Sequence, residues 1–283
     1  MDIRRWSVVG LTAAMLVPGL AACKQPGAES NAGSSASPAA SGTSGAIPGA
    51  TASADAKQAL LASTNEIGNG NFRFNLTSGT TTASGTVHKP SRSAELRSTL
   101  GGPGADLAMD LDLVYIEPDS WVKATFNGSA ADSFPALKNY NGKYLHIDPT
   151  RAKGAQNLVF NFDQLDPAGS AALTKAVVDV HQTGTGQYAG TIDLTKATDA
   201  KMADQALVTA LGAQANSLPF TATLDDQGRL NKLAIQVPAT TKTKAQELTV
   251  TYSDYGAATA AQKPPAGETQ EAPPELYQLF SSR

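Results

Sequence analysis

Side chains of the types that catalyse reactions or bind metals are few in this chain, and they are widely spaced. The three histidines, His88, His146 and His181, form no His-x-x-x-His pair, and the sequence contains no Gly-x-Ser-x-Gly elbow or Walker loop. Because each histidine falls alone on a predicted strand, a position on a strand face explains it better than a role as a ligand. The histidines therefore predict neither a catalytic residue nor a metal site.

Two pairs of neighbouring carboxylates also have simple structural explanations. Asp110 and Asp112 alternate with apolar residues along one predicted strand, whereas Asp225 and Asp226 lie in a predicted turn between two strands. Neither pair indicates metal binding or acid–base catalysis. We expect no enzyme activity and no cofactor, and only a cluster of titratable groups in a cleft would revive the enzyme hypothesis.

The residue with the clearest chemical role is Cys23, which is the only cysteine and ends the sequence Leu20-Ala21-Ala22-Cys23. Arg4, Arg5 and an apolar run from about Val8 to Leu20 precede it, which is the layout of a secretory signal peptide. The run is shorter than the about 20 residues that a membrane-spanning helix needs. The ending resembles the lipobox of bacterial lipoproteins, in which the cysteine is acylated and becomes the first residue. A signal peptide with an accidental cysteine remains the alternative.

Acylation of Cys23 would fix the protein to the extracytoplasmic side of the cell membrane, because two or three acyl chains bind a bilayer stably. We therefore expect a signal peptide at residues 1–22 and an acylated tether at residues 23–53. The tether consists almost wholly of Ala, Ser, Gly, Pro and Thr, a composition that cannot bury enough apolar surface to fold. Its root-mean-square reach would be about 30 Å.

The net charge argues against nucleic acid as a partner. Without Asp2, Arg4 and Arg5, the 25 acidic and 22 basic side chains become 24 and 20, a net charge of about −4. No basic stripe is present that could neutralise phosphates.

Residues 54–256 are predicted to form the folded domain, and most of it shows the period of two that is typical of half-buried strands. Three segments show helical spacing instead: Ser53 to Gly68, with Ser53 as cap and Gly68 as stop; a short helix that begins at Asp166-Pro167; and Thr198 to Gly212. The Pro- and Glu-rich residues 257–283 are predicted to be an exposed tail, with loose docking of Leu276, Tyr277, Leu279 and Phe280 as the alternative. About eleven strands are expected, at residues 72–76, 83–88, 93–100, 107–116, 121–126, 143–147, 177–182, 187–194, 218–224, 229–237 and 247–254.

Eleven strands with apolar faces and only three helices predict an α+β fold, in which a long, curved antiparallel sheet is partly closed over a few helices. Such a sheet either packs solid against its helices or leaves a cavity. The sequence alone favours the solid core, because that is the commoner outcome.

The order of elements and three short motifs resemble the LppX/LprAFG family of actinobacterial lipoproteins and, more distantly, the LolA/LolB carriers. The motifs are Tyr144 to Pro149, the Asp166-Pro167-Ala168 helix start and Tyr252 to Gly256. The resemblance covers about residues 53–256. It implies a LolA-like half-barrel that wraps over helices and encloses a hydrophobic cavity for the acyl chains of lipids or glycolipids.

The first hypothesis is therefore a monomeric, membrane-tethered carrier of lipids or glycolipids that has no catalytic activity. An envelope transporter is a further candidate partner. The alternative hypothesis is a structural or signalling envelope lipoprotein with a solid core, which binds a protein partner. On the first hypothesis, apolar side chains of the sheet and helices would contact the acyl chains: Phe72, Phe74, Leu111, Leu113, Tyr115, Leu173, Leu207 and Leu211.

Overall fold

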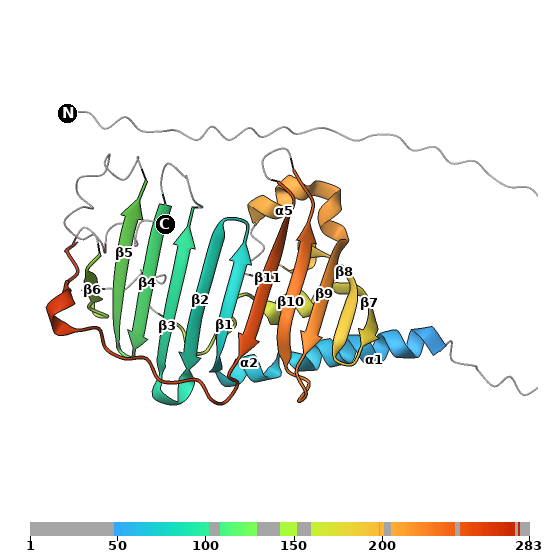
Figure 1. Cartoon of the computed structure of the whole chain (residues 1–283), viewed down its shortest axis with the longest axis horizontal. Coiled ribbons are helices and arrows are strands. Elements are labelled where there is room, and N and C mark those ends of the chain that lie inside the picture. The colour runs from blue at the N-terminus through green and yellow to red at the C-terminus, as the bar shows by residue number, and fades with distance from the viewer. Residues whose placement is uncertain are drawn as a thin grey trace, which may run out of the picture. The chain divides into compact units, whose positions relative to one another are not determined.

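A computed structural model of the chain describes residues 48–101, 108–128, 142–151, 160–197, 199–200, 205–240, 244–274 and 277. These residues form one twelve-stranded open sheet and a few helices (Figure 1), so the predicted α+β class is confirmed. The strand order is β12-β6-β5-β4-β3-β2-β1-β11-β10-β9-β8-β7. Neighbouring strands are antiparallel except for β12, which is parallel to β6.

All eleven predicted strands are present, and the structure adds a twelfth that the sequence did not indicate. The strands are β1 (Asn71–Ser78), β2 (Thr81–His88), β3 (Ser93–Leu100), β4 (Ala108–Ile116), β5 (Asp119–Asn127), β6 (Tyr144–Ile147), β7 (Val177–Gly184), β8 (Gln187–Ile192), β9 (Leu218–Leu224), β10 (Leu230–Val237), β11 (Gln246–Ser253) and β12 (Thr269–Glu271).

The alternation of apolar and polar residues gives the sheet two distinct faces. Phe74 of β1 lies opposite Tyr252 of β11, and Leu233 of β10 lies opposite Val250 of β11. The face that carries these side chains is called the inner face below, because the helices pack against it. The opposite, outer face carries the intervening polar residues such as Arg73.

The helices are short, and α1, α2 and α5 lie behind β1 and β7–β11 in Figure 1. None of the helices among the described residues is both long and apolar enough to cross a bilayer. The α-helices are α1 (Pro48–Ser63), α2 (Asn65–Asn69), α4 (Ser170–Lys175) and α5 (Gln205–Leu211), and the 3-10 turns are η1 (Lys89–Ser91), η4 (Leu194–Lys196), η5 (Gly212–Asn216) and η6 (Ala266–Glu268).

The first predicted helix, Ser53 to Gly68, is divided at Thr64 into α1 and α2, and its two outer ends also differ from the prediction. It begins at Pro48, within the segment predicted as tether, so Ser53 is interior and does not cap it. The Ser53 hydroxyl instead donates to the Val180 carbonyl on β7 at 2.9 Å. The stop is Gly70 and not Gly68, because Gly70 takes the left-handed conformation (φ 66°) that ends α2.

The other two predicted helices are shorter than expected. Asp166 lies four residues before α4, yet its carboxylate accepts a hydrogen bond from the backbone N–H of Ala171 at 2.7 Å, which is the chemistry of a cap. In the third predicted helix, Thr198 to Gly212, the observed helix α5 begins at Gln205, and Asp199 and Ala200 are not helical. Residues 198 and 201–204 of that prediction lie outside the described residues.

The prediction of an exposed C-terminal tail is wrong for residues 257–272, and the burial of Tyr277 agrees with the alternative that this residue docks. Residues 269–271 form β12 beside β6, and Ala258, Ala272 and Tyr277 are buried. The backbone N–H of Asp148 donates to the Tyr277 hydroxyl at 2.9 Å. Residues 257–272 and Tyr277 are therefore part of the folded domain.

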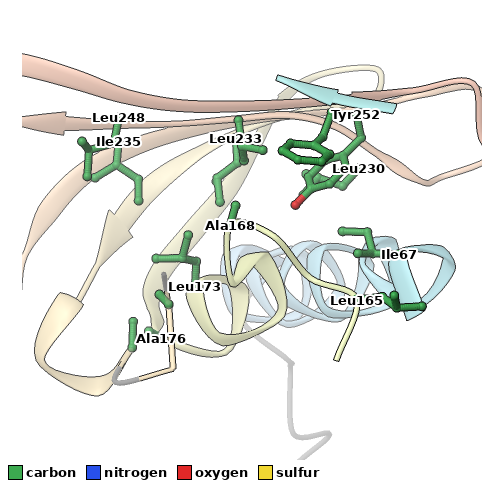
Figure 2. Close-up of a cluster of buried hydrophobic side chains, with 14 of the residues drawn as sticks. Ile67, Leu165, Ala168, Leu173, Ala176, Leu230, Leu233, Ile235, Leu248 and Tyr252 are labelled. Atoms are coloured by element: carbon green, nitrogen blue, oxygen red, sulfur yellow. The ribbon is translucent and has the colours of Figure 1, made fainter. Parts of the chain in front are cut away.

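The core lies between the inner face and the helices, where side chains from both layers meet (Figure 2). Leu173 of α4 and Leu230, Leu248 and Val250 of the sheet have no accessible surface. At the β7 edge, α1 supplies a second donor beside Ser53, because Lys57 Nζ donates to the Val177 carbonyl at 2.7 Å. Two carbonyls of this edge strand are thereby occupied, which hinders pairing with another chain.

Candidate functional site

The eight side chains predicted to contact a ligand come together in a single apolar cluster. Six of them are buried members of the core, and the other two, Leu111 and Leu207, are partly buried and pack against it. Phe72 and Phe74 come from β1, Leu111, Leu113 and Tyr115 from β4, Leu173 from α4, and Leu207 and Leu211 from α5. Cys23, the predicted lipidation site, lies outside the described residues.

Not all of this cluster is available to a ligand. Phe72 and Leu173 have an accessible surface of 0%. A side chain with no accessible surface borders no void that a water molecule could enter, so these two residues belong to a packed core. An acyl chain could reach them only if neighbouring side chains moved.

Burial on the inner face of β2–β5 decreases in steps from one end of the strands to the other. In the first row of paired positions, Val87, Ala94, Tyr115 and Ser120 are all buried. Two residues further along each strand, Leu113 and Val122 are still buried. Inward-facing and outward-facing side chains alternate in the same way along the whole length of these strands. The decrease in burial therefore depends on which elements cover the inner face at each row.

The far end of the same face keeps accessible apolar surface. In the next row Leu111 and Ala124 are partly exposed, and in the last row Leu100 is 39% exposed. We call this area the distal apolar patch; its residues are Leu76, Ala83, Leu100, Met109, Leu111, Ala124 and Phe126. It is continuous with the core, because Leu76 and Leu111 pack against the core cluster.

Two aromatic residues, Phe160 and Phe162, lie at the packed end of this face, beside Tyr115 of the first row. Phe160 and Phe162 lie with their ring centroids 4.8 Å apart, and the Phe160 ring lies 5.2 Å from that of Tyr115. Burial raises the pKa of Tyr115 to about 12, so its hydroxyl is neutral at physiological pH. The charged group that lies beside these rings is the Arg92 guanidinium, 5.4 Å from the centre of the Phe162 ring.

The outer face carries a different kind of pocket. A pocket of 670 Å³ lies between the strands β1–β4 and the segment Gln262–Pro265 of the C-terminal region. Its polar lining includes Arg73, Glu95, Arg97 and Asp112. An acyl chain in this pocket would take water from these charged groups without replacing it by hydrogen bonds, so the pocket suits a polar ligand better.

The titratable groups have structural partners. Asp110 accepts hydrogen bonds from Thr99 and Asn127, and Asp225 accepts backbone hydrogen bonds within its turn, as the strand and turn explanations predicted. Among the described residues, no group of three or more histidine, cysteine or carboxylate side chains is arranged to hold a metal ion.

Sequence reasoning missed two polar groups that shape the molecule. The Tyr252 hydroxyl donates to Asp166 at 3.2 Å and lies 2.8 Å from the Ser170 hydroxyl, inside the core. The second group surrounds His146 of β6, next to the edge strand β12, and is described below. The only sequence signal for either was the presence of polar residues in otherwise apolar runs.

No family model, curated protein or solved structure matches the chain.

Proposed function

We propose that this protein is a lipid-anchored carrier of lipid or glycolipid acyl chains, held at the extracytoplasmic side of the cell membrane by acylated Cys23. The domain would be a half-barrel of the LppX/LprAFG and LolA type, monomeric and without catalytic activity. It would exchange its lipid with the membrane or with an envelope transporter.

The distal apolar patch carries this proposal. Water-accessible apolar side chains on the inner face of a sheet, continuous with the core, form a surface that an acyl chain can cover. The row of Leu111 and Ala124 leads directly to the buried row of Leu113 and Val122, so a chain bound there would extend the core. The polar pocket on the outer face offers no comparable surface.

The energy of such binding would come from burying methylene groups. Each buried methylene contributes about 0.8 kcal/mol, so ten methylenes contribute about 8 kcal/mol before the entropic cost of association. Few polar contacts are then needed, and we expect the protein to accept acyl chains of several lengths.

A pair of tryptophan substitutions on β5 tests the proposal. Ala124 faces the distal apolar patch and Thr125, its neighbour, faces outward. Ala124→Trp should fill the patch and weaken binding of a fluorescent fatty-acyl probe about tenfold or more, with less than the 1 to 3 kcal/mol destabilisation typical of overpacking. Thr125→Trp is the matched control and should leave probe affinity unchanged.

The alternative function, a structural or signalling lipoprotein that binds a protein partner, has its own support. The core at Phe72 and Leu173 is solid, and Leu61 of α1 and Val178 of β7 are 36% and 55% exposed. If the parent protein shows no saturable probe binding and Ala124→Trp destabilises it like a core substitution, the carrier proposal is wrong. The alternative would then stand.

A further inference from the structure

The C-terminal region crosses the outer face of the sheet as an extended segment, residues 257–272, which we call the strap. In Figure 1 it runs below β2–β5 and ends at β12, beside β6. Its backbone is held along the way, because the N–H of Ala258 donates to Asn71 at 2.9 Å and the N–H of Ala261 donates to Ser93 at 3.0 Å.

The strap buries apolar side chains on the face that is otherwise polar. Trp121 and Val114 belong to the outer face, yet they are only 3% and 7% exposed. The Lys263 ammonium of the strap lies over the Trp121 ring at 5.4 Å, and Pro264 beside it is buried. The strap also forms one wall of the outer-face pocket, through Gln262–Pro265.

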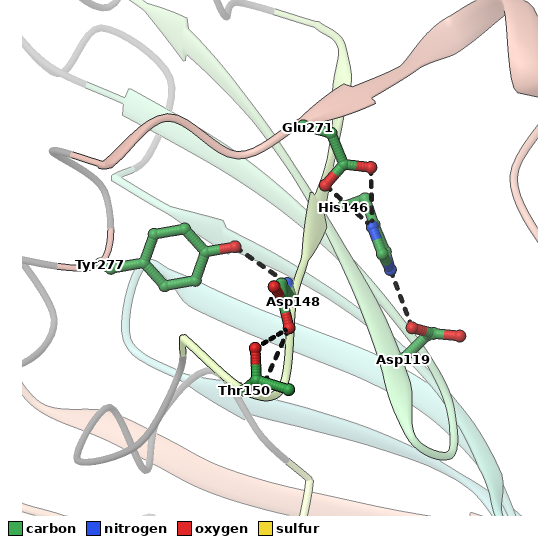
Figure 3. A network of polar contacts seen from close by, with 6 residues as sticks. All are labelled: Asp119, His146, Asp148, Thr150, Glu271 and Tyr277. Carbon is green, nitrogen blue, oxygen red and sulfur yellow. Dashed lines mark hydrogen bonds and ion pairs between the residues drawn. The ribbon is translucent and has the colours of Figure 1, made fainter.

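The far end of the strap is fastened by a histidine between two carboxylates (Figure 3). His146 Nε2 lies 2.9 Å from an Asp119 oxygen on β5, and His146 Nδ1 lies 3.0 Å from a Glu271 oxygen on β12. Ionised carboxylates only accept hydrogen bonds, so both contacts exist only when both ring nitrogens carry hydrogen. This arrangement requires the imidazolium form of His146.

We propose that the strap is a pH-dependent cover of the outer face, fastened by protonated His146 and loosened when His146 loses its proton. A neutral imidazole donates from one nitrogen only, so one of the two carboxylates would then face a lone pair. The Glu271 side chain is 74% exposed and the Asp119 side chain 40%, so Glu271 should be the one that moves away. Loosening would uncover Trp121 and open the outer-face pocket.

The charges around His146 favour its protonated form. Burial by itself would lower the pKa of His146, but hydrogen bonds and charge from Asp119 and Glu271 outweigh it and raise the pKa above 6.5. Stability from this site is therefore complete below about pH 6.5 and is lost as pH rises through the raised value in the folded protein. The other charged groups near this end are Asp148 after β6, Lys123 over the Tyr144 ring, Arg151 over the Tyr277 ring, and Lys263 of the strap.

Two contacts at the same end do not titrate in this range and limit the movement. The Ala272 N–H donates to the His146 carbonyl at 3.0 Å, and the Asp148 N–H donates to the Tyr277 hydroxyl. The backbone pairing of β12 with β6 does not titrate either. Loss of the His146 proton should therefore free the Glu271 side chain and loosen the strap between Pro264 and Glu268, while β12 stays paired with β6.

Trp121 reports this movement, because its ring lies 5.4 Å from the Lys263 ammonium of the strap and 5.4 Å from the His146 ring. The chain has two tryptophans, Trp6 and Trp121, so the full-length protein with Trp6→Phe has Trp121 alone. Acrylamide quenching of Trp121 measures its accessibility and should increase about twofold or more between about pH 5.5 and 8.5. Constant quenching across this range in the folded protein would overturn the proposal.

Two variants separate His146 from other titrating groups, and their expected results are opposite. In His146→Gln the amide hydrogens are on a single nitrogen, so the side chain cannot donate in opposite directions to both carboxylates as the imidazolium does. The substitution also removes the ring beside Trp121, so quenching should be high at every pH. Glu271→Gln supplies an amide that can donate to a neutral imidazole, so quenching should stay low at every pH. His181→Gln, on the outer side of β7, is the matched control and should keep the parent's response.

A pH response that persists in Glu271→Gln, or in a folded His146→Gln, would show that another group controls the strap. If His146→Gln does not fold, the Glu271→Gln result decides by itself, since that variant leaves the contact between His146 and Asp119 intact.

Discussion

Two halves of one sheet have the same strand pattern but differ in how tightly their inner faces are packed. In the helix-covered half, β1 and β7–β11, Leu230, Leu248 and Val250 have no accessible surface. In the strap half, β2–β6, burial decreases along the strands until Leu100 is 39% exposed. Alternation therefore determines which side chains face inward, whereas the covering elements determine whether those side chains are buried.

The largest expected effect is a difference in the cost of leucine truncation between the two halves. Leu248→Ala should destabilise the protein by about 2 to 5 kcal/mol, because it leaves a cavity in a packed core. Leu111→Ala in the strap half should cost about 1 kcal/mol, because part of its side chain already contacts water. Urea unfolding of both variants measures the difference, and equal costs would show that the two halves are packed alike.

The eleven core strands could be predicted from sequence because each carries its own period of two. The alternation also restricts the registers, since a shift by one residue would turn Phe72 and Phe74 to the outer face, but it does not distinguish registers that differ by two residues. β12 could not be predicted in this way, because Thr269, Gln270 and Glu271 contain no apolar alternation. Its position depends on the free edge of β6, which becomes visible only when the sheet is assembled.

The helix ends were less predictable because the tertiary contacts decide them. Ser53 is a good cap by residue type, but in α1 its hydroxyl serves the β7 edge. Pro48 at the first helical position was the signal for the true start of α1.

The sharing of one face was predictable, whereas the accessible area was not: of the eight residues predicted to contact a ligand, only Leu111 belongs to the distal apolar patch. Alternation correctly grouped Phe72, Phe74, Leu113 and Tyr115 on one face. It could not distinguish Phe72, which has no accessible surface, from Leu111, which keeps some, because that depends on elements far away in sequence. His146 and Glu271, which are 125 residues apart, illustrate the same limit.

A smaller difference in stability is expected when the hydroxyl is removed from an inner-face tyrosine in each half of the sheet. Tyr252→Phe should cost about 1 to 3 kcal/mol, because it removes the hydroxyl partner of Asp166 and of the fully buried Ser170. Within the described residues the Tyr115 hydroxyl has no hydrogen-bond partner, so Tyr115→Phe should change stability by less than about 0.5 kcal/mol. Thermal or urea unfolding compares the two variants.

A double variant tests the reason for the Tyr252 effect. Ser170→Ala combined with Tyr252→Phe should cost less than the sum of the single changes, because the two hydroxyls are partners. Strict additivity would mean that the Tyr252 hydroxyl stabilises the core in another way.

The smallest change in stability is expected from the exposed ion pairs on the outer face of the strap half. Arg97 Nε lies 3.0 Å from Asp112, but the Arg97 side chain is 77% exposed. Asp112 keeps a second cation when Arg97 is removed, because Lys123 Nζ lies 2.9 Å from it and is only 24% exposed. Arg97→Ala should therefore cost less than about 0.5 kcal/mol, and Lys123→Ala should cost more.

This last pair decides where the difference between the halves originates. If Arg97→Ala costs little in urea unfolding and its effect falls further in high salt, outer-face charges contribute little to the stability of the strap half. The packing of the inner face would then account for the contrast between Leu248 and Leu111. A cost above about 1 kcal/mol for Arg97→Ala would instead mean that the outer face compensates for the loosely covered inner face. In that case the interactions of the outer face, on which the strap lies, would contribute most of the stability of the strap half.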